Sequence, residues 1–144
     1  MRSAIVTIAV AMSLSAQAAT VTGTFNVNIT LTSSCQVNMT AADVNIAYTS
    51  FQSTPAISTG GAVSIRCTNL LPYTVSISGA SVTDDKVDIA YTLALSAASG
   101  VGTGLYQNYT ITGTAAAGQA GKCTTATCTN SLATNKVKTL TVTY

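Results

Sequence analysis

The sequence predicts an all-β domain, a β-sandwich with immunoglobulin-like topology. Apolar and polar residues alternate with a period of two in one segment after another, which is typical of strands that bury one face. Runs rich in Gly, Ser, Asn and Asp separate these segments and favour turns. No stretch keeps the 3.6-residue period of an amphipathic helix, although Ala115 to Ala120 could form one helical turn. The length of 144 residues corresponds to about one domain.

The segment from Val21 to Leu31 has the most regular alternation. Its even positions are all Thr or Asn, and its odd positions are Val21, Gly23, Phe25, Val27, Ile29 and Leu31. We therefore predict a strand here with one face to be buried. Gly23 would allow a close backbone approach within that face.

Shorter segments with the same alternation predict the remaining strands. They are Val63 to Cys67, Tyr73 to Ile77, Val87 to Leu95, Tyr109 to Ile111 and Leu140 to Tyr144. The turns expected between strands are Ser58 to Gly61, Asn69 to Pro72, Gly79 to Asp85, Ser96 to Gly104 and Gly113 to Gly121.

The body of the domain is expected to lack one strand. From Cys35 onward it offers about six strands, whereas an immunoglobulin-like sandwich needs about seven. We expect the last strand, with Leu140, Val142 and Tyr144, to lack a partner along its outer edge. The segment from Val21 to Leu31 could be an edge strand of its own sheet, but it is long enough to lie in a groove of another molecule. We therefore expect an incomplete immunoglobulin-like sandwich, completed by a donor strand from a neighbouring subunit.

The first 18 residues have the features of a secretory signal peptide. Arg2 supplies a positive start, Ala4 to Leu14 are mostly apolar, and Ala16-Gln17-Ala18 fits a cleavage site. The apolar run is shorter than the roughly 20 residues that span a bilayer, which argues against a membrane anchor. We expect a signal peptide over residues 1–18, a donor-strand extension over 19–32, a domain over 33–144, and no membrane span in the mature chain.

Four cysteines follow the expected cleavage site: Cys35, Cys67, Cys123 and Cys128. An even number in an exported domain predicts two disulfides, for which three pairings exist. We favour Cys35 with Cys67 and Cys123 with Cys128, because the second pair is close in sequence. Metal binding by these cysteines is the alternative, and export argues against it.

The composition argues against several classes of function. Charged residues make up 7% of the chain, the net charge is +2 and histidine is absent, which disfavours nucleic-acid binding and most hydrolase or zinc chemistry. Asp84, Asp85 and Asp88 could bind a cation, but a solvated turn is the simpler interpretation. Gly100 to Gly104 lacks the lysine of a phosphate loop and is interpreted as a hairpin turn. We expect no catalytic residue, metal or cofactor.

Four stretches together resemble the spore coat protein U family: Val21 to Ile29, Gly60 to Cys67, Pro72 to Gly79 and Leu140 to Tyr144. That family includes rod subunits of archaic chaperone-usher pili of the Csu type. The resemblance implies a pilin domain held by a periplasmic chaperone and polymerised at an outer-membrane usher. It implies that Val21, Gly23, Phe25, Val27 and Ile29 form the donor strand, that Cys35 and Cys67 form the family disulfide, and that Tyr144 lies beside the acceptor groove. Cys123 and Cys128 have no place in the resemblance.

The expected function is that of a structural pilus subunit in a surface filament for adhesion and biofilm formation. Its partners would be identical or homologous subunits, the chaperone and the usher. A minor adaptor subunit or a secreted coat protein of the same family is the first alternative. A monomeric, exported carbohydrate-binding β-sandwich is the second.

Overall fold

A computed structural model describes residues 19–40, 43–131 and 136–144. The chain divides into two units, residues 1–31 and residues 32–144. In the first unit, residues 19–31 form no strand, and their large apolar side chains are exposed, from 70% for Val27 to 95% for Val21. The strand expected from Val21 to Leu31 is therefore absent from the single chain, because a strand needs a neighbour for its backbone hydrogen bonds. The expected signal peptide lies outside the described residues.

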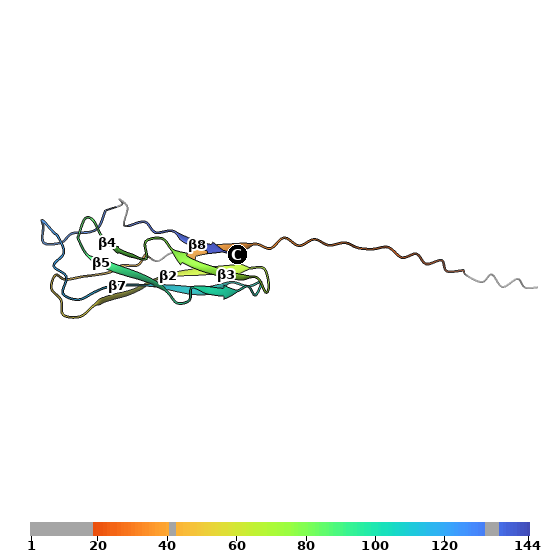
Figure 1. Cartoon of the computed structure of the whole chain (residues 1–144), viewed down its shortest axis with the longest axis horizontal. Helices are drawn as coiled ribbons and strands as arrows, with labels where there is room; N and C mark the ends of the chain where they lie inside the picture. The colour runs from red at the N-terminus through yellow and green to blue at the C-terminus, as the bar shows by residue number, and fades with distance from the viewer. Residues whose placement is uncertain (1–18, 41–42, 132–135) are drawn as a thin grey trace, which may run out of the picture. The chain divides into compact units, whose positions relative to one another are not determined.

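The second unit is a sandwich of two antiparallel sheets (Figure 1). The larger sheet has the order β1 (Cys35–Thr40), β2 (Ala56–Cys67), β7 (Gln107–Ala115), β5 (Ala90–Leu95) and β4 (Ser81–Thr83). The smaller sheet has the order β6 (Ser99–Val101), β3 (Pro72–Ile77) and β8 (Leu140–Thr143). The described residues contain no helix, so the all-β prediction is confirmed, and no candidate membrane-spanning helix exists among them.

Several turns expected from the sequence contain strands instead. Ser58 to Gly61 lies inside β2, Gly79 to Asp85 contains β4, and Ser96 to Gly104 contains β6. The prediction at Ser58 to Gly61 was wrong because its glycines serve a β-bulge. The register with β7 shifts between Gly60 and Ala62, and Gly61 has a φ of 57°, a conformation that glycine adopts without strain.

The bulge turns both halves of β2 toward the same core. Before it, Ala56, Ser58 and Gly60 are the half-buried positions, and after it Val63, Ile65 and Cys67 are fully buried. Without the extra residue, the period of two would bring Ser64 and Arg66 inward. The bulge therefore keeps a charged side chain out of the sandwich.

The buried core lies between β2, β3 and β7. It contains Val63, Ile65, Cys67, Tyr73, Val75 and Tyr109. A disulfide joins Cys35 on β1 to Cys67 on β2, which are direct partners in the ladder. This bridge ties the start of the second unit to its core.

Candidate functional site

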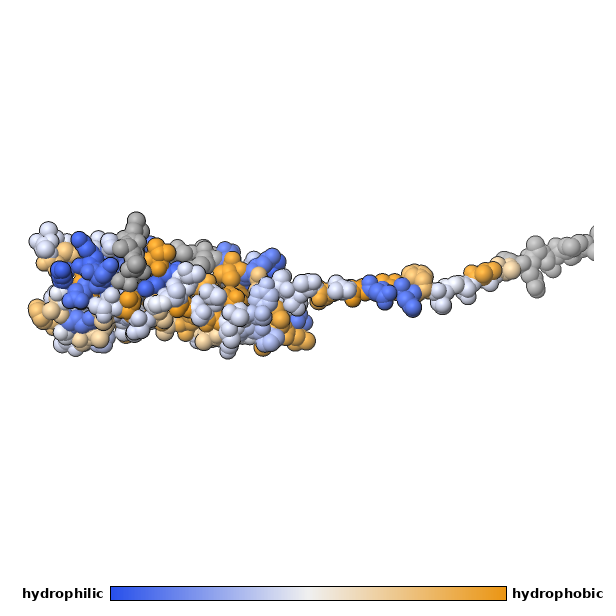
Figure 2. All heavy atoms as spheres, turned by 45° about the horizontal axis from the view of Figure 1, so that its top comes forward, coloured by the Kyte–Doolittle hydropathy of each residue, from blue (hydrophilic) through white to orange (hydrophobic). Residues whose placement is uncertain are grey.

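An open groove of about 630 Å³ runs between the two sheets of the second unit. Strands β2, β5 and β7 of the larger sheet, strands β3 and β8 of the smaller sheet, and residues 43–48 all line it. The apolar side chains that line it include Val44, Ile46, Tyr48, Ile77, Val87, Ile89, Tyr91, Leu93, Ile111 and Leu140. Figure 2 shows hydrophobic atoms at the surface of this unit, interspersed with hydrophilic ones.

The groove side chains are only half-buried, although they occupy inward positions of the sandwich. Tyr91, Leu93 and Leu95 are the half-buried members of an alternating pattern on β5, and Leu140 and Val142 are those of β8. In a completed sandwich, the inward positions of both sheets interdigitate to form a dry core. The interior is therefore closed where Ile65 and Val75 lie and incomplete along the groove.

Residues 43–48 form the floor of the groove through close contacts with two glycines. A Cβ atom added to Gly60 would lie 2.5 Å from the Asp43 carbonyl oxygen and 2.8 Å from the Val44 Cα. A Cβ atom on Gly113 would lie 2.6 Å from a Val44 methyl group. The two glycines on the paired strands β2 and β7 thus let the segment lie directly on the larger sheet.

Two open backbone edges border the groove. In the described part of the chain, β8 pairs with β3 alone, so its other edge has no ladder. From Val44 to Tyr48, half-buried and exposed positions alternate, yet the main-chain N–H and C=O groups of this segment make no hydrogen bond to any described residue. Because both segments line the same groove, a further strand there would find a hydrogen-bonding edge available on each.

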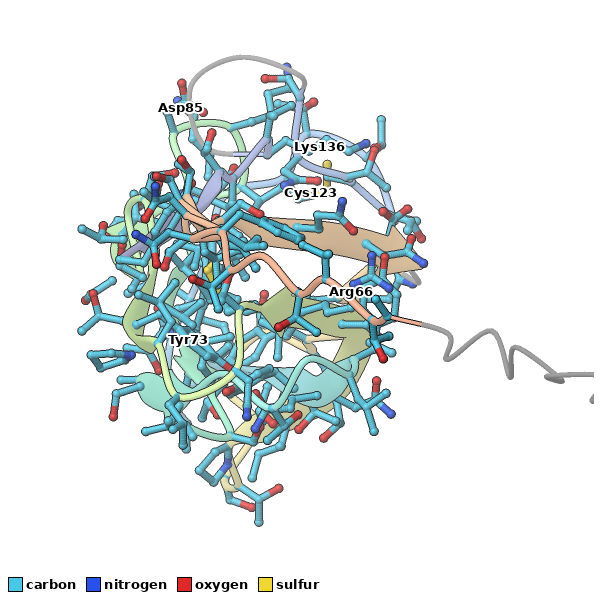
Figure 3. The ribbon with its side chains drawn as sticks, turned by 90° about the vertical axis from the view of Figure 1, so that its right-hand side faces the viewer. Arg66, Tyr73, Asp85, Cys123 and Lys136 are labelled. Carbon is cyan, nitrogen blue, oxygen red and sulfur yellow. A yellow bond between two sulfur atoms is a disulfide. The ribbon has the colours of Figure 1, made fainter. Side chains whose placement is uncertain are left out.

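One buried carboxyl group also lines the groove. Asp84 is 2% exposed, and its Oδ1 atom accepts hydrogen bonds from the Lys86 and Val87 main-chain N–H groups at 2.9 and 3.0 Å. Its Oδ2 atom is buried and has no hydrogen-bond partner among the residues that the structure describes. The interpretation of the acidic cluster as a solvated turn was therefore wrong for Asp84, whereas Asp85 and Asp88 are exposed. Figure 3 shows Asp85 at the outside of the unit.

The second disulfide closes a short loop beside the groove. Cys123 and Cys128 are bonded, and Cys128, Thr129 and Asn130 line the groove. In Figure 3, Cys123 and Lys136 lie on the same side of the unit. Both pairings in the structure are those that the sequence analysis favoured, and no cysteine is left free.

The other predicted site residues, on the last strand and in the extension, do not all lie at the groove. Leu140 lines the groove, Val142 packs against the core, and Tyr144 is 59% exposed. The five predicted donor residues belong to the first unit, so their role stays a prediction. Val44 to Tyr48 were not among the predicted site residues. The available signal was a large apolar side chain at every second position, Val44, Ile46 and Tyr48.

The remaining candidates have structural roles. Gly100 belongs to β6 rather than to a hairpin turn, and a Cβ there would lie 2.6 Å from the Tyr73 and Tyr109 side chains. No group of three metal-ligating His, Cys, Asp or Glu residues occurs in the described ranges.

A family model for the Spore Coat Protein U domain matches residues 21–144. The chain belongs to the spore coat protein U family. This is a family of structural subunits of surface pili and coats rather than of enzymes, and it is associated with chaperone-usher fimbriae. The matched range includes both the alternating segment after residue 20 and the sandwich with its groove. Searches of curated proteins and of solved structures found no match.

Proposed function

We propose that this protein is the rod subunit of a surface pilus and polymerises by donor-strand complementation. The groove bordered by β8 and Val44 to Tyr48 is the observation that carries the proposal. It combines half-buried inward side chains with two backbone edges that have no ladder in the described residues. A strand inserted there would cover the inward side chains and would also pair with the backbone edges. Family membership supports the same assignment.

The occupant of the groove would be the extension of another copy. Its apolar positions, Val21, Phe25, Val27 and Ile29, are exposed in the single chain. Each apolar side chain that becomes fully buried would contribute roughly 1.5–3 kcal/mol, and the backbone ladder would add affinity that does not depend on sequence. Gly23, with open space around it, would suit a narrow part of the groove.

Head-to-tail exchange would build a filament. Each subunit would give its extension to one neighbour and accept an extension from another, a heterologous contact that does not close on itself. Before assembly, a periplasmic chaperone would cover the groove and an outer-membrane usher would accept the complex. Export would require cleavage of the signal peptide over residues 1–18. The pilus would serve adhesion and biofilm formation.

A peptide complementation experiment tests the proposal. A variant that lacks Ala19 to Ile29 should remain monomeric, and a synthetic peptide of residues 19–31 should bind it and raise its Tm. The same peptide with Phe25→Asp serves as the matched control and should bind far more weakly. If the truncated chain neither loses polymerisation nor binds the peptide, the proposal fails and a self-sufficient monomer, such as a carbohydrate-binding sandwich, becomes the better interpretation.

A further inference from the structure

Phe51 and Leu70 are exposed apolar residues that lie in turns and have positive φ angles. Phe51 is 73% exposed with a φ of 62°, and Leu70 is 78% exposed with a φ of 65°. Each is the third residue of a tight turn, closed by hydrogen bonds from Gln52 N–H to the Thr49 carbonyl and from Leu71 N–H to the Thr68 carbonyl, both 3.1 Å. Bulky residues rarely adopt the left-handed region, and such outliers gather at functional sites.

The two turns lie at opposite ends of the sandwich. Phe51 precedes the start of β2, and its N–H donates to the Gln119 carbonyl beyond the end of β7. Leu70 follows the end of β2, and its N–H donates to the Gly102 carbonyl just after β6. Leu105, 72% exposed, lies on the same connection as Gly102. We call these ends the Phe51 pole (residues 49–52 and 116–119) and the Leu70 pole (residues 68–71 and 102–106).

The direction of β8, which borders the groove, shows which end of the groove lies toward each pole. Leu140 pairs with Ile77, and Thr143 pairs with Thr74, while Pro72 at the start of β3 pairs with Val101 beside the Leu70 pole. The strand therefore begins toward the Phe51 pole and ends toward the Leu70 pole. Every ladder in the described residues is antiparallel. A donor segment that pairs with β8 in the same way would have the last of the predicted donor residues, Ile29, near the Phe51 pole of the acceptor.

The link from this donor segment to its own body is short. Residues 30–33 separate Ile29 from Ser34, and a chain of this length spans at most about 18 Å. Ser34 is held at the Leu70 pole of its own subunit, where its N–H donates to Thr68 Oγ1 and its carbonyl accepts from Thr68 N–H, both at 3.0 Å. The Leu70 pole of the donor subunit must then lie close to the Phe51 pole of the acceptor.

We propose that these poles form a second, apolar interface between successive copies, in which Phe51 of the acceptor packs against Leu70 and Leu105 of the donor. This inference rests on the proposed donor-strand function, which brings the poles together. The two turns hold apolar side chains outward at the ends of the unit, and Figure 2 shows hydrophobic atoms at both ends. Burial of these side chains between copies would limit bending at the junction.

Photocrosslinking in assembled filaments of the full chain tests this interface. A benzoylphenylalanine at position 51 should crosslink to the peptides around Leu70 or Leu105 of the neighbouring copy. The same probe at Ile57, which is 68% exposed on the flank of β2, is the matched control and should give little of this product. In filaments that carry the probe at position 51, Leu70→Ser should reduce the crosslink yield several-fold.

The outcomes separate this interface from the donor-strand function. One contrary result is that dissociation-resistant filaments crosslink from position 51 only to other regions, and another is that they crosslink no more strongly than from position 57. Either result would overturn the interface between the poles and leave the proposed function standing. If the unmodified chain forms no filaments at all, the proposed function fails, and the interface fails with it.

Discussion

The hydroxyl oxygens of Tyr73 on β3 and Tyr109 on β7 lie 2.6 Å apart, so a buried hydrogen bond joins the two sheets. The two rings meet edge to face, with centroids 6.5 Å apart and an interplanar angle of 74°. The Tyr73 hydroxyl also lies 2.9 Å from Gln107 Oε1, to which it can donate. This pair closes the complete end of the sandwich, in contrast to the open groove.

The Tyr73 hydroxyl predicts a loss of stability at high pH. Burial, and then its hydrogen bond and charge interaction with Tyr109, raise the pKa of Tyr73 from 10.0 to about 12. Above pH 10 the unfolded chain releases this proton first, so the free energy of unfolding should fall as the pH rises from 10 to 12, by about 2–3 kcal/mol in total. Urea unfolding across this range measures the effect. Tyr73→Phe should remove this part of the pH dependence, whereas Tyr106→Phe, at an exposed ring, should keep it.

Substitution of Gly60, which lies under the groove floor, should lower both the stability of the chain and its affinity for a donor strand. Gly60→Ala would place a methyl group against the backbone of Asp43 and Val44, which should lower the stability by about 1–3 kcal/mol. It should also weaken binding of the residue 19–31 peptide to the truncated chain, because Val44 to Tyr48 would shift. Gly104→Ala, in open space with a φ of 75°, is the control. It should cost about 1 kcal/mol and leave peptide affinity unchanged; equal effects on affinity would argue against this role of the floor.

The two disulfides should contribute unequally to stability. The pair Cys35–Cys67 closes a separation of 32 residues and the pair Cys123–Cys128 one of 5. In the chain-entropy treatment, their loss should cost about 3–4 kcal/mol and about 2 kcal/mol, respectively. Double serine variants of each pair, compared by denaturant unfolding, measure both values. A larger loss from the short loop would indicate that it has a role in the fold beyond local closure.

The alternation of the extension predicts which substitutions block assembly. Phe25→Asp would place a charge in an apolar groove and should reduce filament yield strongly. Thr24→Asp changes the neighbouring position on the opposite face and should be tolerated. Electron microscopy and the amount of dissociation-resistant polymer measure both variants. Equal yields from Phe25→Asp and the unmodified chain would contradict the predicted register of the donor strand.

Period-two patterning was sufficient to predict much of the sandwich, because strands such as β3 and β8 bury one face and expose the other. It failed where glycines act through tertiary contacts. Gly60 and Gly61 have the composition of a turn, but one admits Val44 and the other forms a bulge. The three-residue strands β4 and β6 are too short for their alternation to be distinguished from a turn.

The candidate site was only partly predictable, because it too depends on tertiary contacts. The need for one more strand was predictable, because the body offered about six alternating segments and an immunoglobulin-like sandwich needs about seven. The second edge, Val44 to Tyr48, has the alternation of a strand but no ladder in the described residues, so its role depends on where it lies in the groove. The burial of Asp84 depends on the neighbouring β-strands and has no signal in the local sequence.

Hydrogen–deuterium exchange is the most direct test of donor-strand complementation at the groove. Filaments of the full chain should be compared with the monomeric variant that lacks Ala19 to Ile29. Amides of β8 on the edge away from β3, and amides from Val44 to Tyr48, should exchange rapidly in the monomer and become strongly protected in the filament. Filaments in which both edges still exchange as fast as in the monomer would contradict donor-strand complementation.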